Sequence, residues 1–357
     1  MKGSSRIVKS LLKGSKPVYV ILFVTARCNA RCKHCFYWKN IDQAEARDEL
    51  KLEEIERICK GLGQLMQVSL TGGETFLRND LVEICNVVCR YTNPLIITIT
   101  TNGLLTEKIE KDMEMILEQN PGTHFRISIS LDGWEEEHDL IRDVKGIFEA
   151  VTRTYDSLDK LRKRHDNLNI DFCTVLSSYN VDNIRGIFNS VEERFDADNH
   201  LLTLLRGTPR CKSAIADTLD AYEEMQRYIE VKEKKREKKP FDRFLHVVYE
   251  ESLREIINTA RKKSMVVPCV AGERLIEISE TGDVFPCELL DKKMGNIRDF
   301  DYDINRLLAS KGAEQVRRSI RDKKCYCTFE CAINASVIFD FKRYPRLLGK
   351  IFFKRFN

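Results

Sequence analysis

Residues 25–38 read TARCNARCKHCFYW and place Cys28, Cys32 and Cys35 within one short loop. The loop follows an apolar run, VYVILFV at residues 18–24, which has the composition of a buried β-strand. A structural zinc site needs four ligands and a disulfide bond needs two, so three thiols in one loop match neither arrangement. The segment predicts a first strand that ends in a specialised, cysteine-bearing loop.

The composition of the 357-residue chain is that of an ordinary globular protein, with 43% hydrophobic and 32% charged residues. A net charge of +4 is too small to indicate nucleic-acid binding by itself, and no nucleic-acid partner is expected. No apolar run reaches the roughly 18 residues that a membrane span requires. The basic N-terminal stretch lacks the continuous apolar core of a signal peptide. We therefore expect a cytoplasmic protein.

The 13 cysteines are unevenly distributed along the chain. In a reducing compartment such clusters favour metal binding over disulfide bonds. Most of the isolated cysteines are expected to be buried packing residues. Besides the N-terminal three, a second group lies near the other end of the chain: Cys269, Cys287, Cys325, Cys327 and Cys331.

Strand-like and helix-like segments alternate along the first 212 residues and form six strand–helix units. Such alternation predicts parallel strands joined by right-handed crossovers. Six units favour an α/β fold with an open, partial (β/α)6 barrel; a doubly wound sheet is the alternative. In both folds the chemistry lies at the carboxyl ends of the strands. The predicted strands are 18–24, 67–70, 95–101, 125–131, 169–176 and 200–205, and the predicted helices are 52–62, 80–91, 106–119 (with Thr106 as N-cap), 144–164 and 181–195.

The pattern changes after the sixth strand. A charged segment, 217–239, reads as a solvated connector, and 242–263 reads as a helix. Two short apolar runs flanking a Gly-containing turn then predict a β-hairpin, so a small α+β extension follows the barrel. The expected organisation is a basic N-terminal segment (1–17), the barrel (18–212), a helical connector (213–264), the cysteine-bearing extension (265–335) and a basic amphipathic tail (336–357).

Three thiolates can hold a 4Fe–4S cluster while one of its four irons has no protein ligand. An open iron can bind a small molecule, whereas a fully ligated cluster can only transfer electrons. Zinc is the competing interpretation, and it would require His34 as a fourth ligand. Because His34 lies between Cys32 and Cys35 in the sequence, it is poorly placed for that role.

The spacing Cys28-x₃-Cys32-x₂-Cys35, followed by Phe36 at the end of a first strand, resembles the signature of the radical S-adenosylmethionine (SAM) superfamily. Further segments resemble the parts of that family that line SAM. In this resemblance Gly72, Gly73 and Glu74 meet the amino group of the methionine moiety, and the backbone around His34 and Phe36 meets the adenine. The remaining SAM-lining residues that the resemblance implies are Thr101, Asn102, Ser130 and Asp132.

The resemblance also implies an activity. The methionine amine and carboxylate of SAM chelate the open iron, an electron from the cluster cleaves SAM, and the resulting 5′-deoxyadenosyl radical removes a hydrogen atom from a substrate. The cofactor supplies the difficult chemistry, and the protein supplies placement and the exclusion of competing reactions. An electron donor such as flavodoxin or ferredoxin is an expected partner.

The second cysteine group fits the spacing C-x₁₂-G-x₄-C from Cys269 to Cys287, which resembles the opening of SPASM or twitch extensions. Five thiols cannot fully ligate two 4Fe–4S clusters, so we expect one auxiliary 4Fe–4S cluster. It would be held by Cys269, Cys287 and two of the last three cysteines, with Cys327 and Cys331 preferred and Cys325 left open. A zinc site with the same thiolates is the alternative.

The last residues combine aromatic and aliphatic side chains with Lys and Arg, and no acidic residue follows Asp340. This tail predicts either peripheral contact with an anionic membrane surface or packing back on the enzyme.

The sequence therefore predicts a radical SAM enzyme acting on a non-peptide substrate, such as a sugar, nucleotide or lipid-linked metabolite, for oxidation, epimerisation or C–C bond formation. A peptide-modifying radical SAM/SPASM maturase is the first alternative. A zinc-bearing regulator that binds nucleic acid is the second, and the SAM-lining segments count against it.

Overall fold

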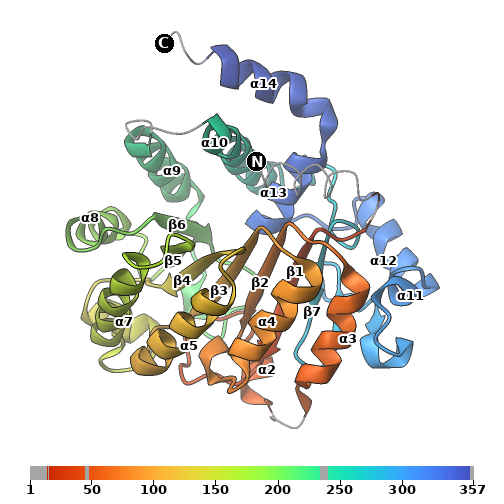
Figure 1. The fold of residues 1–357 in the computed structure, drawn as a ribbon. Coiled ribbons are helices and arrows are strands. Elements are labelled where there is room, and N and C mark those ends of the chain that lie inside the picture. Colours follow the sequence, from red (N-terminus) through yellow and green to blue (C-terminus); the bar gives the residue numbers. More distant parts are fainter. Residues whose placement is uncertain (1–13, 15, 45–47, 234–239, 354–357) are drawn as a thin grey trace.

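The computed structural model describes residues 14, 16–44, 48–233 and 240–353, with the side chains of 233, 240–246 and 351–353 left out. Most of the predicted basic segment 1–17 lies outside these residues. The described strands form one sheet in the order β6-β5-β4-β3-β2-β1-β7-β8-β9. Figure 1 shows helices packed along one side of this sheet.

The first six strands are parallel and lie side by side in chain order. A doubly wound sheet reverses its strand order at a switch point, and this sheet does not. The strand order therefore confirms the partial barrel. The strands are β1 (Tyr19–Thr25), β2 (Gln67–Gly72), β3 (Ile96–Thr101), β4 (His124–Ser130), β5 (Leu168–Leu176) and β6 (Asn199–Leu204).

The crossover helices follow the predicted positions closely. One detail of the prediction is wrong: Thr106 is the first helical residue, and its hydroxyl contacts Thr154 at 2.8 Å instead of capping the helix. The long helices are α3 (Leu52–Leu62), α4 (Leu81–Thr92), α5 (Thr106–Gln119), α7 (Ile147–Arg162) and α8 (Ile184–Arg194); shorter ones are α2 (Trp38–Asp42), α6 (Glu136–Arg142), and the 3-10 turns η2 (Thr75–Leu77), η3 (Lys212–Ala214), η4 (Ile297–Phe300) and η5 (Phe341–Arg343).

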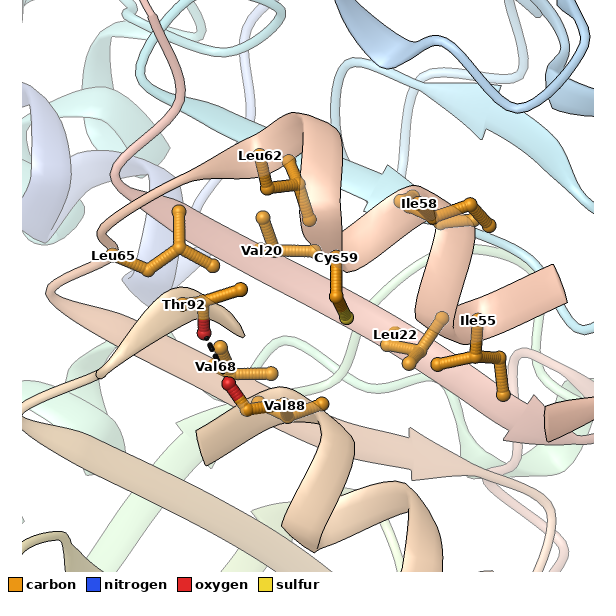
Figure 2. A pocket seen from close by; sticks show the side chains of 11 residues that line it. Val20, Leu22, Ile55, Ile58, Cys59, Leu62, Leu65, Val68, Val88 and Thr92 are labelled. Carbon is orange, nitrogen blue, oxygen red and sulfur yellow. Dashed lines mark hydrogen bonds between the residues drawn. The ribbon is translucent and has the colours of Figure 1, made fainter. Parts of the chain in front are cut away.

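The two faces of the sheet differ in chemistry. On the helix-covered face, Val20 and Leu22 of β1 pack with Ile55 and Ile58 of α3 (Figure 2). Because side chains alternate along a strand, the neighbouring residues point to the opposite face, here called the inner face. Burying apolar surface stabilises the fold by about 25 cal/mol per Å², so the helix-covered face is where the core of the barrel forms.

The inner face is lined largely by hydroxyl and other polar groups. On β3, the helix-facing Ile97 and Ile99 are fully buried, whereas Thr98 and Thr100 are half-buried. The strand register places Ser69 of β2 beside Thr98, and Thr100 donates a hydrogen bond of 2.9 Å to Thr71. A closed barrel fills its interior with branched apolar side chains, so this polar inner face belongs to an open barrel.

The C-terminal extension continues the barrel sheet. β7 (Leu275–Ile278) pairs in parallel with β1, and the predicted hairpin is present as β7 and β8 (Asp283–Phe285), followed by β9 (Gly295–Asn296). The extension thereby places its own side chains on the inner face. Its helices are α11 (Ile304–Leu308), α12 (Lys311–Arg321) and α13 (Glu330–Phe339).

The connector and the tail are helical. α9 (Leu219–Glu233) has a buried side formed by Tyr222 and Met225, so the charged segment is a packed helix for most of its length. α10 (Pro240–Lys262) lies next to α13 and α14 (Tyr344–Phe353) (Figure 1).

The tail packs back on the enzyme, because the buried carboxylate of Glu251 pairs with Arg343 at 3.1 Å, Arg346 at 3.3 Å and Lys350 at 2.9 Å. Among the described residues, no helix combines the length and the apolar character that crossing a membrane requires.

Candidate active site

The loop that carries Cys28, Cys32 and Cys35 begins where β1 ends. Cys32 is buried, the other two are half-buried, and all three thiols are free. The chain after β6 holds the loop from the side, because Arg210 N–H donates to the carbonyl of Cys35 at 3.0 Å and Cys211 N–H donates to that of Lys33 at 2.8 Å. The segments that follow β1 and β6 therefore meet at this loop.

A buried ion-pair network fixes the start of the loop. Glu49, 7% exposed, accepts from Arg27 at 3.0 Å and from Arg78 at 3.3 Å, and it also binds the hydroxyl of Thr25. Arg78 in turn donates to the backbone carbonyl of Leu50. Sequence reasoning did not identify these residues, since charged side chains without a motif give no signal.

The two glycines of the TGGE segment lie against the same loop. A Cβ atom on Gly72 would stand 2.1 Å from the carbonyl oxygen of Thr25, and one on Gly73 would stand 2.2 Å from that of Arg27. Gly72 also has φ +132, which L side chains rarely adopt. Gly73 N–H donates to Thr25 at 2.8 Å. These glycines thus let the end of β2 bind the backbone that precedes the cysteines.

Glu74 organises the neighbouring strand ends. Its carboxylate, 1% exposed, accepts from the backbone N–H of Phe76 at 3.1 Å, the hydroxyl of Thr101 at 2.8 Å and the N–H of Asn102 at 2.7 Å. Burial raises the pKa of Glu74, and these donors oppose that rise. Asn102 also donates to Asn29 in the cysteine loop at 2.7 Å. Glu74 therefore connects the end of β2 to the end of β3 through hydrogen bonds within the protein. The sequence did not predict this structural role.

Asp132 is fully buried where β4 ends. One oxygen accepts from the N–H of Val175 at 2.8 Å, and the other pairs with Arg142 at 2.5 Å and faces His34 at 3.6 Å. Burial is the largest single influence and opposes ionisation, but Arg142, His34, His138 and the hydrogen bond from Val175 together outweigh it and hold the pKa of Asp132 below its usual value. Asp132 N–H donates to His138 Nδ1 at 3.0 Å. The Asp132 carboxylate is therefore engaged by the protein itself.

Arg142 was not assigned a role by the sequence, although it belongs to a polar run after the fourth strand. It is 7% exposed and donates to Cys32 Sγ at 3.5 Å while it pairs with Asp132. The short helix α6 thus places a cation between the cysteine loop and the end of β4. Its only sequence signal was a polar run, of which His138 and Arg142 are buried.

The last two predicted SAM-lining residues are only partly buried. Phe36 packs against Gly207, whose added Cβ would lie 3.0 Å from Phe36 Cβ. Ser130 lies opposite Cys173 in the strand register, on the inner face.

The N-terminal thiols suit a cluster better than a single ion. Within the described chain, no three His, Cys, Asp or Glu side chains converge on one point to hold a metal ion. Ligands of a cubane each bind a different iron, so they need not converge on one point. Soft thiolates are the donors that iron–sulfur clusters use. Burial raises the pKa of Cys28 to about 11 and that of Cys35 to about 12, so metal binding must displace their protons.

The cysteines of the second group have different neighbours in the structure. Cys287 has Cys327 and Cys269 as electrostatic neighbours, and Cys327 in turn has Cys325. The sulfur of Cys331 instead accepts a hydrogen bond of 3.2 Å from Tyr19 on the inner face of β1. The structure thus groups Cys325 with Cys269, Cys287 and Cys327, whereas the sequence favoured Cys331 over Cys325.

Two family profiles match the chain: residues 22–191 match the radical SAM superfamily, and residues 269–332 match the iron–sulfur cluster-binding domain called SPASM. Among relatives, the AdoMet-dependent heme synthase of Methanosarcina barkeri is 29% identical over 77% of this chain and 78% of its own length. The subtilosin biosynthesis protein AlbA of Bacillus subtilis is 27% identical over 80% of this chain and 59% of its own length. The GTP 3′,8-cyclase of Alkaliphilus oremlandii is 31% identical over 37% of this chain and 43% of its own.

Solved structures share the fold. Native anSMEcpe with bound AdoMet superposes with a TM-score of 0.58 at 16% identity, covering 94% of this chain and 99% of that one. Streptococcus suis SuiB bound to S-adenosylmethionine gives a TM-score of 0.60 at 19% identity, covering 90% and 72%. The three-cysteine loop, the strand-end segments and the two profile matches lead to one conclusion: the chain belongs to the radical SAM superfamily and is an enzyme of that class, with a SAM-binding 4Fe–4S cluster and a SPASM domain for an auxiliary cluster.

Proposed function

We propose that this enzyme acts on a non-peptide substrate, a sugar, nucleotide or lipid-linked metabolite, held on the inner face of the barrel between its two cysteine groups. When bound there, the reduced cluster and SAM supply a 5′-deoxyadenosyl radical that removes a hydrogen atom from the substrate. The observation that carries this proposal is the polar inner face. Its hydroxyl groups, such as Thr98 and Thr100, are half-exposed and can bind a polar ligand.

Within this proposal Cys28, Cys32 and Cys35 ligate the SAM-binding cluster. Gly72 and Gly73 keep the backbone close to the cysteine loop. Glu74 already accepts three protein hydrogen bonds, so it can offer the methionine ammonium only a further, shared contact.

The other proposed SAM-lining residues act in different ways. Thr101, Asn102 and Asp132 are buried and hydrogen-bonded, which suits a role in holding the SAM-binding surface rigid. Ser130 and Phe36 are less buried and are the better candidates for direct contact. His34 is buried beside Asp132 and contributes mainly through its backbone.

For the auxiliary 4Fe–4S cluster we propose Cys269, Cys287, Cys325 and Cys327 as ligands. This choice replaces Cys331 with Cys325, and it is supported by the electrostatic influence of Cys325 on both Cys269 and Cys327 and by that of Cys269 and Cys327 on Cys287. An electron donor such as flavodoxin or ferredoxin completes the system.

The relative from Methanosarcina barkeri, which matches 77% of this chain and 78% of its own length, is named a heme synthase, and this name supports a non-peptide substrate. A peptide-modifying role is the second candidate, because AlbA, a bacteriocin biosynthesis protein, matches 80% of this chain. Peripheral membrane contact is less favoured, since three basic residues of the tail pair with Glu251.

The test is anaerobic incubation of the reconstituted enzyme with dithionite and SAM, with chromatography for 5′-deoxyadenosine. The wild type should form it, and Cys32→Ala should not. Addition of fractionated small metabolites should stimulate its formation more than addition of peptide fractions. Stimulation by peptides alone would favour the maturase role.

A further inference from the structure

Strand β7 places one acidic side chain on the inner face. In the parallel register between β1 and β7, Glu277 lies beside Ile21. The flanking Ile278 lines the apolar cavity on the helix-covered face together with Val20 and Leu22. Because side chains alternate along a strand, Glu277 points the other way, toward the polar inner face.

The carboxyl of Glu277 is buried without a partner. The side chain is 6% exposed, and no described residue forms a hydrogen bond or ion pair with its carboxyl. Burial and the charges of Glu288 and Glu280 all raise the pKa of Glu277, and no cation opposes them. Buried polar groups nearly always have partners in folded proteins, so an unpaired carboxyl in a cluster of carboxyls needs an explanation.

The cation closest to this cluster is already committed. Arg206 pairs with Glu288 and with Glu330, each at 3.4 Å, and lies over the ring of Phe329 at 5.0 Å. One guanidinium therefore serves two carboxylates and leaves Glu277 without a counterion. Among the described residues, the group therefore holds more carboxyl groups than cations.

This carboxyl group and the strand-end network share a neighbour. The thiol of Cys173, on the inner face of β5, has Arg206 and Glu330 as electrostatic neighbours and also Asp132 and Arg142. The second pair belongs to the strand-end network beneath Cys32. A substrate on the inner face would therefore lie between the SAM-binding rim and Glu277.

We propose that Glu277 binds a positively charged nitrogen of the substrate, an ammonium or a guanidinium. The inference rests on the proposed function, because it takes the inner face to be the substrate chamber. A substrate cation supplies the partner that the protein withholds, and a charge-assisted hydrogen bond in a buried site is strong and directional. A bound metal ion is the poorer explanation, since no three ligand side chains of the described chain converge there.

The test uses the anaerobically purified holoenzyme and methylammonium chloride as the probe, with sodium chloride at the same concentration as the control for ionic strength. At about 100 mM, methylammonium should raise the melting temperature of the wild type by about 2–4 °C more than sodium does, as expected for a millimolar site. Glu277→Gln should abolish the difference. Glu273→Gln, which removes a solvent-accessible carboxylate paired with Arg321, should keep it.

A second measurement separates binding from a structural role. Because none of the described groups pairs with the carboxyl, Glu277→Gln without probe should melt at or above the wild-type temperature. A melting temperature well below that of the wild type, or equal responses to methylammonium and sodium in the wild type, would overturn the inference. Formation of 5′-deoxyadenosine by the wild type is scored separately, so its absence would count against the proposed function and not against this site.

Discussion

The buried pair between Arg142 and Asp132 should be among the most sensitive polar contacts in the barrel. Arg142→Met removes the guanidinium but keeps much of its volume, and it leaves a carboxylate that is 0% exposed without its 2.5 Å partner. His34 faces the same carboxylate at 3.6 Å, but burial lowers its pKa to about 4, so it is neutral at pH 7 in the wild type and leaves Arg142 as the charged partner.

The expected loss follows from the cost of an uncompensated buried charge. Removing one partner of such a pair destabilises a protein by about 3–5 kcal/mol. At about 2.1 cal/mol/K of unfolding entropy per residue, 1 kcal/mol shifts the melting temperature of a 357-residue protein by about 1.3 °C, so the melting temperature should fall by about 4–7 °C. The exposed pair of Arg194 and Asp156, at 2.9 Å, is a matched control, and Arg194→Met should cost less than about 1 kcal/mol.

The assay is thermal denaturation of the wild type and both variants at one scan rate. The single variant Asp132→Asn and the double variant Arg142→Met/Asp132→Asn are measured in the same way. Because the two side chains contact each other, the double variant should lose less than the sum of its single changes, by about 0.5–3 kcal/mol. If Arg142→Met melts within the error of Arg194→Met, the pair does not carry the stability assigned to it here.

Three further outcomes follow from single residues. Gly73→Ala should lower both stability and iron content, because its methyl group would stand 2.2 Å from the carbonyl oxygen of Arg27, whereas Gly122→Ala, with open space around it, should change neither. Burial lowers the pKa of His138 to about 3, so between about pH 6.5 and 5 the imidazole binds a proton in the unfolded chain but not in the folded protein, and the free energy of unfolding falls as the pH falls. In denaturant titrations from pH 7 to 5, the slope of the unfolding free energy against pH should be smaller in His138→Asn by up to about 1.4 kcal/mol per pH unit. Cys325→Ala should lose iron from the auxiliary site, while Cys331→Ala should retain it; the reverse result would restore the ligand set first expected from the sequence.

The barrel could be predicted because its signals are local. Each strand of the barrel is a short apolar run followed by a helix with apolar periodicity, and the three-cysteine spacing is specific enough to name a family. The boundaries of α3 are predicted to the residue, because Ile55, Ile58 and Leu62 all face the sheet. The first six strands lie in chain order without a reversal of strand order, which alternation alone did not guarantee.

The interior network could not be predicted, because its partners are distant in sequence. Arg142 reaches Cys32 across 110 positions, and Tyr19 reaches Cys331 across 312. Only the folded sheet brings such residues together. The same limit applies to Glu74, whose role in joining strand ends depends on where β3 ends.

The most direct test of the whole account is the electron paramagnetic resonance spectrum of the reduced enzyme with SAM that carries ¹⁵N in its methionine amino group. In a Cys287→Ala variant, which lowers the auxiliary signal, the remaining cluster should show coupling to ¹⁵N, because an iron without a protein ligand binds that nitrogen. A cluster spectrum that labelled SAM leaves unchanged would contradict the account, since the three-cysteine loop would then hold a fully ligated metal centre.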